Sequence, residues 1–127
     1  MIQKFRERDF PWTEHLFRCD EYHIYKDGFP VTEGHLLFVP SVNSDTCITA
    51  CFTGAYRYGE KLVANGEIDA FNVGFNSGPA AGQTVQWPHV HMIPRRNGDM
   101  DDPTGGVRHV IPHMGNYKKS EGVQDER

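Results

Sequence analysis

Apolar and polar residues form short blocks along the chain that predict strands. Residues 15–25 (HLFRCDEYHIY) alternate imperfectly around a charged pair and predict two short strands or one bent strand. Turn residues at 26–28 precede HLLFVP at 35–40, a continuous apolar run typical of a buried strand. Residues 69–75 alternate as a half-buried strand does, and 86–94 (QWPHVHMIP) predict a further strand ending at a proline.

One long helix is predicted between these strands. Possible N-cap residues stand at 43–46, and Asn65 with Gly66 closes the segment. Between them, apolar residues recur at near-helical spacing: Ile48, Phe52, Ala55, Tyr56, Leu62 and Val63. Hairpin-spaced strands around one main helix predict an α+β fold on an antiparallel sheet of about five strands, because strands and helices do not alternate repeatedly.

The length of 127 residues supports a single domain over 1–127, with a polar C-terminal extension from about 97 to 127. Within that extension, 105–112 form a last short apolar element, and the charged tail 117–127 is predicted to be mobile. No window approaches the ~18–20 uncharged apolar residues of a spanning helix, and the first 25 residues lack the apolar centre of a secretory signal. We therefore expect a cytoplasmic protein that has no membrane partner.

Charge and cysteine content exclude further classes. Lys plus Arg number 13 against 17 Asp plus Glu, a net charge of −4, which disfavours a nucleic-acid partner because such proteins neutralise phosphates with a basic surface. The three cysteines, Cys19, Cys47 and Cys51, are odd in number and form no CxxC pair. Structural disulfides are therefore not expected.

The candidate chemistry lies in one block, GPAAGQTVQWPHVH. His89 and His91 are two apart on a predicted strand, so both side chains project from one face with their Cβ atoms about 7 Å apart. Just upstream, the turn at 78–82 has small residues that let backbone N–H groups approach an anion, and Gln83 and Thr84 add side-chain donors. Together these groups suit attack by one imidazole on a phosphorus atom whose oxygens the donors hold.

Imidazole suits this reaction because its ordinary pKa of ~6.5 leaves it largely neutral at pH 7. A covalent nucleotidyl-histidine intermediate then needs no metal or other cofactor, and the second imidazole holds a proton for the leaving group. An HxH pair by itself is more often surface decoration or part of a metal site. A metal-dependent hydrolase that uses His89, His91 and a carboxylate therefore stays open, while His15, His23, His109 and His113 are taken as surface or core residues.

Three blocks of the chain resemble the histidine triad (HIT) superfamily of nucleotide hydrolases and transferases. KDGFPVTEGHLLFVPS at 26–41 is similar to the early hairpin of that family, and NVGFNSGPAAGQTVQWPHVHMIPRR at 72–96 to its signature strand, loop and strand. The long helix stands between them, as in the family. The resemblance implies a HIT-like fold and a homodimer that joins two sheets.

The resemblance also implies roles for individual residues. His89 matches the nucleophile in the middle of the triad, and His91 matches the third triad position. Four positions match substrate-binding residues: Asn76, Gln83 and Thr84 at the phosphate and leaving group, and Asp27 at the ribose hydroxyls. His35 matches a Gly-His position that supports the histidine strand from behind.

One position departs from the family pattern. Trp87 stands at the first triad position, followed by Pro88, so the local sequence is WPHVH. The ring nitrogen of tryptophan donates a hydrogen bond but does not accept one. Any orienting role of the first histidine is therefore lost or transferred, and weakened activity is expected.

The sequence thus predicts a HIT-type hydrolase or transferase that acts at the α-phosphorus of a nucleotide substrate. Dinucleoside polyphosphates and nucleoside phosphoramidates are candidate substrates, and a nucleotidyl-His89 intermediate is expected. The alternative is a non-catalytic nucleotide-binding or regulatory protein of the same family.

Overall fold

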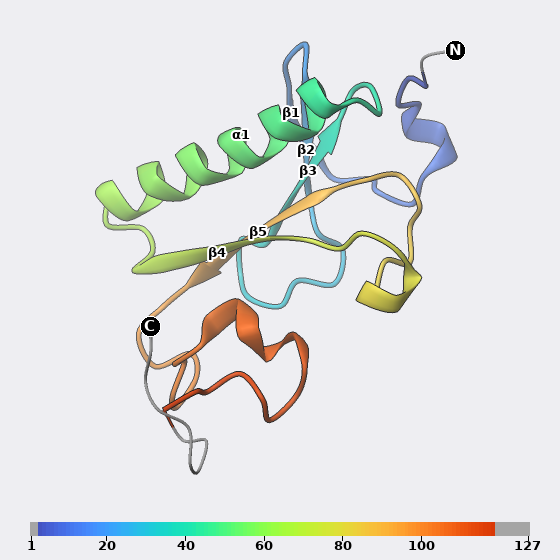
Figure 1. Cartoon of the computed structure of the whole chain (residues 1–127). Helices are drawn as coiled ribbons and strands as arrows, with labels where there is room; N and C mark the ends of the chain where they lie inside the picture. The colour runs from blue at the N-terminus through green and yellow to red at the C-terminus, as the bar shows by residue number, and fades with distance from the viewer. Residues whose placement is uncertain (1–2, 119–127) are drawn as a thin grey trace. The chain divides into compact units, whose positions relative to one another are not determined.

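The computed structural model describes residues 3–118, and the chain forms two compact units, Met1–Arg95 and Arg96–Arg127. The first unit contains a five-stranded antiparallel sheet in the order β1-β2-β3-β5-β4 (Figure 1). Its strands are β1 (His15–Arg18), β2 (Tyr22–Lys26), β3 (Leu36–Pro40), β4 (Ala70–Phe75) and β5 (Val90–Arg95), and its helix is α1 (Asp45–Ala64). The predicted α+β fold is confirmed, and residues 15–25 form two strands.

Helix α1 begins and ends where the sequence predicts. The Ser44 side chain caps the helix by accepting a 3.2 Å hydrogen bond from the N–H of Cys47. At the other end, Asn65 is the C-cap and Gly66 follows with φ of +75°, a left-handed conformation that suits glycine. The helix then connects directly to β4.

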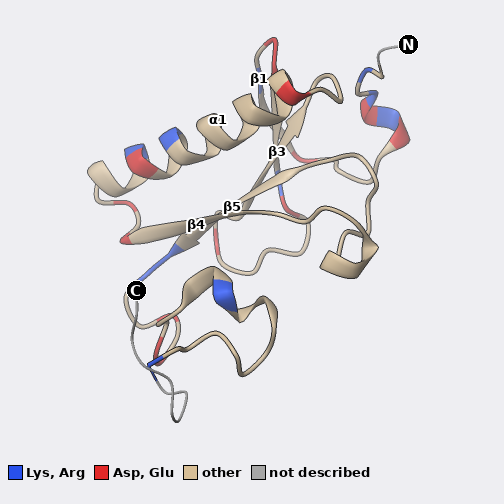
Figure 2. Ribbon diagram, viewed as in Figure 1, with Lys and Arg blue, Asp and Glu red and all other residues tan. Residues whose placement is uncertain are grey.

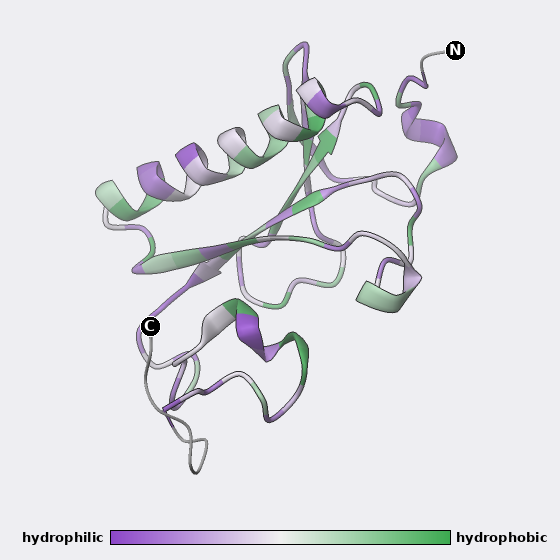
Figure 3. Ribbon diagram, in the orientation of Figure 1, coloured by the Kyte–Doolittle hydropathy of each residue, from purple (hydrophilic) through white to green (hydrophobic). Residues whose placement is uncertain are grey.

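The sheet carries an apolar cluster on each face, because successive strand residues point to opposite sides. Under α1, residues of the inner strands pack on Cys51 and Ala55: Ile24, Leu36, Phe38, Val90 and Met92. Figure 3 shows the hydrophobic colouring along the strands and the mixed colouring of α1. On the other face, Tyr25, Leu37, Val39 and Trp87 form a second cluster, covered by aromatic residues of the N-terminal segment. His91 pairs with Leu37 and therefore lies on this second face.

The strand predicted at 86–94 begins only at Val90, so this expectation was wrong by four residues. The β3–β5 register pairs Phe38 with Val90, and two residues further it would set Pro40 opposite Pro88. Neither proline has an N–H group to continue the ladder. The chain therefore leaves the sheet just before β5, and His89 lies at this exit.

The second unit is held together by side chains that bond to its own backbone. It contains one short 3-10 helix, Gly106–Val110, within the predicted apolar element at 105–112, and no residue of that helix is buried. The His109 ring donates from Nε2 to the carbonyl of Thr104 at 2.8 Å, and Arg108 Nε donates to the carbonyl of Gly115 at 3.0 Å. Most of the tail that the sequence predicts to be mobile, 119–127, lies outside the described residues.

Charged residues of both signs are interspersed along the N-terminal segment and α1 (Figure 2). Within the described residues, no helix has the length and apolar character that crossing a bilayer requires.

Gly59 tests the packing of α1 on β4. It is buried, and an added Cβ would lie 2.5 Å from the ring of Phe71. We expect Gly59→Ala to lower the free energy of unfolding by about 1–3 kcal/mol through overpacking, although alanine is the better helix former by ~1 kcal/mol. Urea unfolding measures this change. Thr49→Ala, on the exposed side of the same helix, is the control and should change stability by no more than about 0.5 kcal/mol; a stabilised Gly59→Ala would contradict the packing.

Candidate active site

The His89 ring is fixed by one hydrogen bond to the backbone. Its Nδ1 lies 2.8 Å from the carbonyl oxygen of Trp87. A carbonyl oxygen only accepts hydrogen bonds, so Nδ1 carries the hydrogen and the neutral ring keeps its lone pair on Nε2. A nucleophilic imidazole needs this tautomer, because the nitrogen that attacks must have a free lone pair.

His35 and His91 form a second, linked pair. The backbone N–H of Val31 donates to Nδ1 of His35 at 3.1 Å, so the hydrogen of this neutral ring is on Nε2. That Nε2 lies 2.9 Å from Nδ1 of His91 and donates to it. The hydrogen of His91 is therefore on its own Nε2. His35 is buried, and its hydrogen bond sets the tautomer of His91.

Burial keeps both of these rings neutral. It lowers the pKa of His35, against a smaller opposite effect of the Asp27 carboxylate. It also lowers the pKa of His91 to about 4, and the neighbouring His89 and His35 rings lower it further while Asp27 opposes them. His91 is therefore a neutral hydrogen-bond donor at pH 7.

Asp27 lies beside this histidine pair. One carboxylate oxygen accepts from the backbone N–H of Phe29 at 2.8 Å, and the other lies 3.4 Å from His35 Nε2 and 3.9 Å from His91 Nδ1. By distance alone, Asp27, His35 and His91 form a group able to hold a metal ion. The hydrogen bonds oppose this use, because Nε2 of His35 carries a hydrogen and offers no lone pair to a metal.

A cavity of about 350 Å³ collects the histidines and most of the predicted substrate-binding residues. Asp27, Asn76, Thr84, His89 and His91 all line it. The His89 and His91 ring centroids lie 5.3 Å apart, so both rings reach the same space. This volume is within the range of small-molecule sites.

Gln83 is not among the residues that line the cavity. Its side-chain oxygen accepts from the N–H of Gly78 at 2.8 Å, and its side-chain nitrogen donates to the carbonyls of Val85 and Gln86 at 3.0 and 2.8 Å. The Gln83 side chain therefore connects two parts of the glycine-rich loop by hydrogen bonds.

Backbone N–H groups of the loop also form hydrogen bonds within the loop. The N–H groups of Ala81, Gly82 and Gln83 donate to carbonyls of Gly78 or Pro79. The sequence led us to expect such N–H groups to face an anion. Here they close a tight turn, in which Gly78 and Gly82 have φ of +93° and +95°. The donors that line the cavity from this loop region include Asn76 and Thr84.

Trp87 lies in the second core cluster and not in the cavity. Its side chain is 8% exposed, and its indole N–H donates to the carbonyl of Pro40 at 2.9 Å. The contact that orients His89 comes from the Trp87 backbone, which every residue type offers.

Sequence analysis missed two aromatic residues of the cavity, Trp12 and Phe29. Phe29 lies two residues after the predicted Asp27. This closeness to a candidate substrate-binding residue was the one sequence signal that could have identified it. Trp12 belongs to the N-terminal segment, whose contacts with the sheet depend on the tertiary fold.

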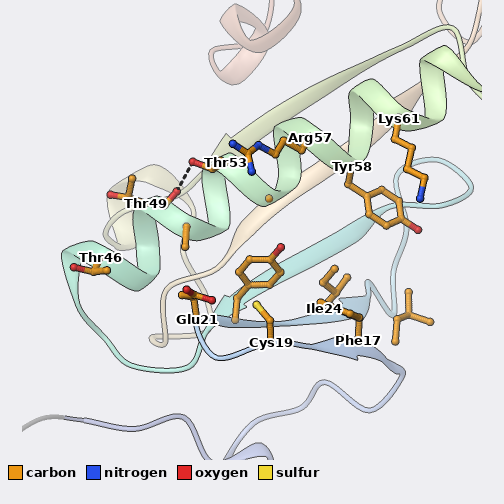
Figure 4. Close-up of a pocket in the computed structure, with 14 residues that line it drawn as sticks. Phe17, Cys19, Glu21, Ile24, Thr46, Thr49, Thr53, Arg57, Tyr58 and Lys61 are labelled. Atoms are coloured by element: carbon orange, nitrogen blue, oxygen red, sulfur yellow. Dashed lines mark hydrogen bonds between the residues drawn. The ribbon is translucent and has the colours of Figure 1, made fainter.

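A larger groove of about 980 Å³ lies on the other face of the sheet, between α1 and the β1–β2 hairpin (Figure 4). Thr49, Thr53 and Tyr58 line its helix side, and Phe17 and Ile24 its strand side. None of its lining residues, all in the described part of the chain, is a histidine. The candidate residues His89 and His91 line the smaller cavity instead.

A family model described as the HIT domain matches residues 13–98, more than half of the chain. The chain belongs to the HIT family. The five-stranded sheet and the helix between β3 and β4 are thus those of a HIT protein.

Two of the curated relatives carry the names of enzymes. The chain is 30% identical over 91 residues to adenylylsulfatase HINT3 of Arabidopsis thaliana, covering 66% of this chain and 46% of that protein. It is 33% identical over 79 residues to the bifunctional bis(5'-adenosyl)-triphosphatase/adenylylsulfatase FHIT of the same plant, covering 57% and 44%. It spans about half the length of these two relatives.

Solved structures share the fold. A Zn-bound histidine triad family protein from Mycobacterium smegmatis matches with a TM-score of 0.64 and 27% identity over 72% of this chain and 71% of that one. SMU.412c from Streptococcus mutans UA159 matches with a TM-score of 0.61 and 25% identity over 75% and 64%.

His91 makes the stability of this HIT protein depend on pH. Its pKa is about 4 in the folded state against an ordinary 6.5, so the unfolded state binds more protons between these values. The stabilisation is complete above pH 6.5 and is lost as the pH falls toward 4, a change of at most about 3 kcal/mol. His91→Gln keeps an acceptor for His35 and removes the titration. Urea unfolding at about pH 7 and about pH 5 should show a smaller loss in this variant than in the wild type; equal losses would contradict the assignment.

Proposed function

We propose that the protein hydrolyses or transfers a nucleotidyl group by nucleophilic attack of His89 on the α-phosphorus. The observation that carries this proposal is the state of the His89 ring. Its Nδ1–H donates to the Trp87 carbonyl, which leaves the lone pair on Nε2, and His89 lines the cavity. The Nε2–P bond forms as the bond from phosphorus to the leaving group breaks. Water then attacks the nucleotidyl-His89 intermediate and releases the nucleotide.

The other cavity residues have supporting roles in this proposal. The Nε2–H of His91 donates to an oxygen of the phosphate, and Asn76 and Thr84 hold further oxygens. Asp27 keeps acceptor capacity for the ribose hydroxyls beside its bond to the Phe29 N–H. We assign Gln83 to the shape of the loop, since its amide is already used there.

A neutral His91 favours anhydride substrates. Phosphate and sulfate leaving groups depart as stable anions, whereas an amine must gain a proton as it leaves. His91, with a pKa of about 4, is not in its protonated imidazolium form at pH 7 and so does not supply that proton. The names of two relatives, an adenylylsulfatase and a bis(5'-adenosyl)-triphosphatase/adenylylsulfatase, agree with this preference. We therefore expect dinucleoside polyphosphates or adenylyl sulfate to turn over faster than a nucleoside phosphoramidate.

His89→Ala tests the mechanism directly. The variant should lose turnover of a dinucleoside polyphosphate by at least about 10³-fold while still binding adenosine monophosphate. Wild-type protein mixed with α-phosphorus-labelled substrate and quenched in base should carry label that His89→Ala lacks. The control, His113→Asn, changes an exposed histidine with φ of 70°, a conformation that asparagine tolerates, and should retain turnover.

Two other outcomes would replace this mechanism. Tight nucleotide binding with turnover unchanged in His89→Ala would leave a non-catalytic, regulatory role. Loss of turnover on chelation, restored by zinc, would favour a metal-dependent hydrolase.

We also propose that the protein is a homodimer formed along β4 and α1. β4 is an edge strand of the sheet, so among the strands of residues 3–118 none pairs with its outer side. Beside it, Phe52 and Tyr56 of α1 contact Phe75 and Phe71 of β4, with ring centroids 5.6 and 6.0 Å apart, and both helix residues remain exposed. An aromatic surface next to an open strand edge is suited to a second copy of the chain.

Tyr56→Glu should convert a dimer to a monomer, because it places a charge in this aromatic surface. Sedimentation or light scattering measures the mass. Phe17→Glu is the matched control, since Phe17 is similarly exposed on β1 at the opposite edge of the sheet. A wild-type monomer, or dissociation by the control alone, would contradict the proposed interface.

A further inference from the structure

The N-terminal segment, residues 3–12, crosses the second face of the sheet and is called the strap here (blue in Figure 1). Backbone and side-chain bonds attach it: the Phe5 N–H donates to the Ser41 carbonyl at 2.8 Å, and the Tyr25 hydroxyl donates to Glu7. Its three aromatic rings, Phe5, Phe10 and Trp12, pack on the second core cluster. The strap is therefore part of the folded unit that contains the cavity.

Trp87 supports the strap from below. Its ring centroid lies 5.8 Å from that of Phe5 and 5.6 Å from that of Phe10. The indole is fixed in turn by its hydrogen bond to the carbonyl of Pro40 at 2.9 Å. A large aromatic residue two positions before His89 thus gives the strap a rigid surface to pack on.

Trp12 connects the strap to His89. Phe10 stacks on Trp12 with ring centroids 5.6 Å apart and an interplanar angle of 19°, and Trp12 meets the His89 ring edge-on at 5.0 Å and 61°. Trp12 also lines the cavity, whereas Phe10 does not. A continuous series of ring contacts therefore runs from Trp87 through Phe10 and Trp12 to the nucleophile.

We propose that Trp12 is a positioning residue that holds the His89 imidazole in line for attack, and that the strap keeps Trp12 there. This inference rests on the proposed function of His89. The hydrogen bond from Nδ1 to the Trp87 carbonyl restrains the ring at one atom, and the T-shaped contact with Trp12 restrains it a second time. Alignment of the reacting atoms is a large part of the catalysis of a displacement at phosphorus, so a loose ring slows the reaction without weakening substrate binding.

The experiment compares four variants with the wild type, using a dinucleoside polyphosphate as substrate and adenosine monophosphate as binding probe. Trp12→Ala removes the positioning ring, and Trp12→Phe keeps an aromatic ring at that site. Phe10→Ala removes the ring that holds Trp12, and the double variant joins Phe10→Ala to Trp12→Ala. Phe17→Ala, at a half-exposed aromatic on β1 outside the strap, is the control, and thermal melting of each variant reports whether it folds.

We expect Trp12→Ala to lower kcat by about 10- to 100-fold while KM and the affinity for adenosine monophosphate change little. Trp12→Phe should restore most of kcat. Phe10→Ala should lower kcat when it is the only substitution. It should cause no further loss of kcat when Trp12→Ala is already present, since Phe10 acts through Trp12. Phe17→Ala should leave kcat unchanged.

A raised KM with unchanged kcat in Trp12→Ala would overturn the inference, because Trp12 would then be only a wall of the binding site. Additive losses from Phe10→Ala and Trp12→Ala would also overturn it. Turnover that persists in His89→Ala would instead overturn the proposed function, whatever the strap variants do. Loss in His89→Ala with full activity in every strap variant would remove this inference alone.

Discussion

The antiparallel pairing of β3 with β5 is the constraint on which the rest of the site depends. It brings Leu37 opposite His91 and so places His35, one residue before β3, within 2.9 Å of that ring. Two residues beyond its last pair, Phe38 with Val90, the ladder meets two prolines and stops. His89 therefore stands where the chain leaves the sheet, with a backbone geometry that lets its ring bond to the carbonyl two residues earlier.

The sequence was sufficient for features that depend on local chemistry. The N-cap at Ser44, the stop at Asn65 and Gly66 and the apolar run at 35–40 each follow from side-chain properties within a few residues. The spacing of His89 and His91 also led us to expect two neighbouring rings, and their centroids lie 5.3 Å apart although His89 stands just before β5. The start of β5 was misplaced because it depends on a proline 48 residues away, Pro40, which local periodicity does not reveal.

Some features of the candidate site could not be predicted from the sequence, because they too depend on the tertiary fold. The sequence shows that Gln83 and the loop backbone have N–H groups that can donate hydrogen bonds. It does not show the direction in which these groups point. In the fold, the short turn with two left-handed glycines brings Gln83 close enough to Gly78 to bond within the loop. Trp12 was not predicted because its contact with His89 requires the strap, the second core cluster and the end of β5 to be assembled together.

This arrangement explains how the position two residues before His89 accepts tryptophan. The backbone carbonyl orients the His89 ring, so the side chain at that position does not need to accept a hydrogen bond from His89. The side chain is then available for packing, and Trp87 uses it to bond Pro40 and to support Phe5 and Phe10. Replacing an imidazole by an indole there does not leave His89 without its hydrogen bond. The polar contact with His89 comes from the backbone, and the indole side chain packs against Phe5 and Phe10 of the strap.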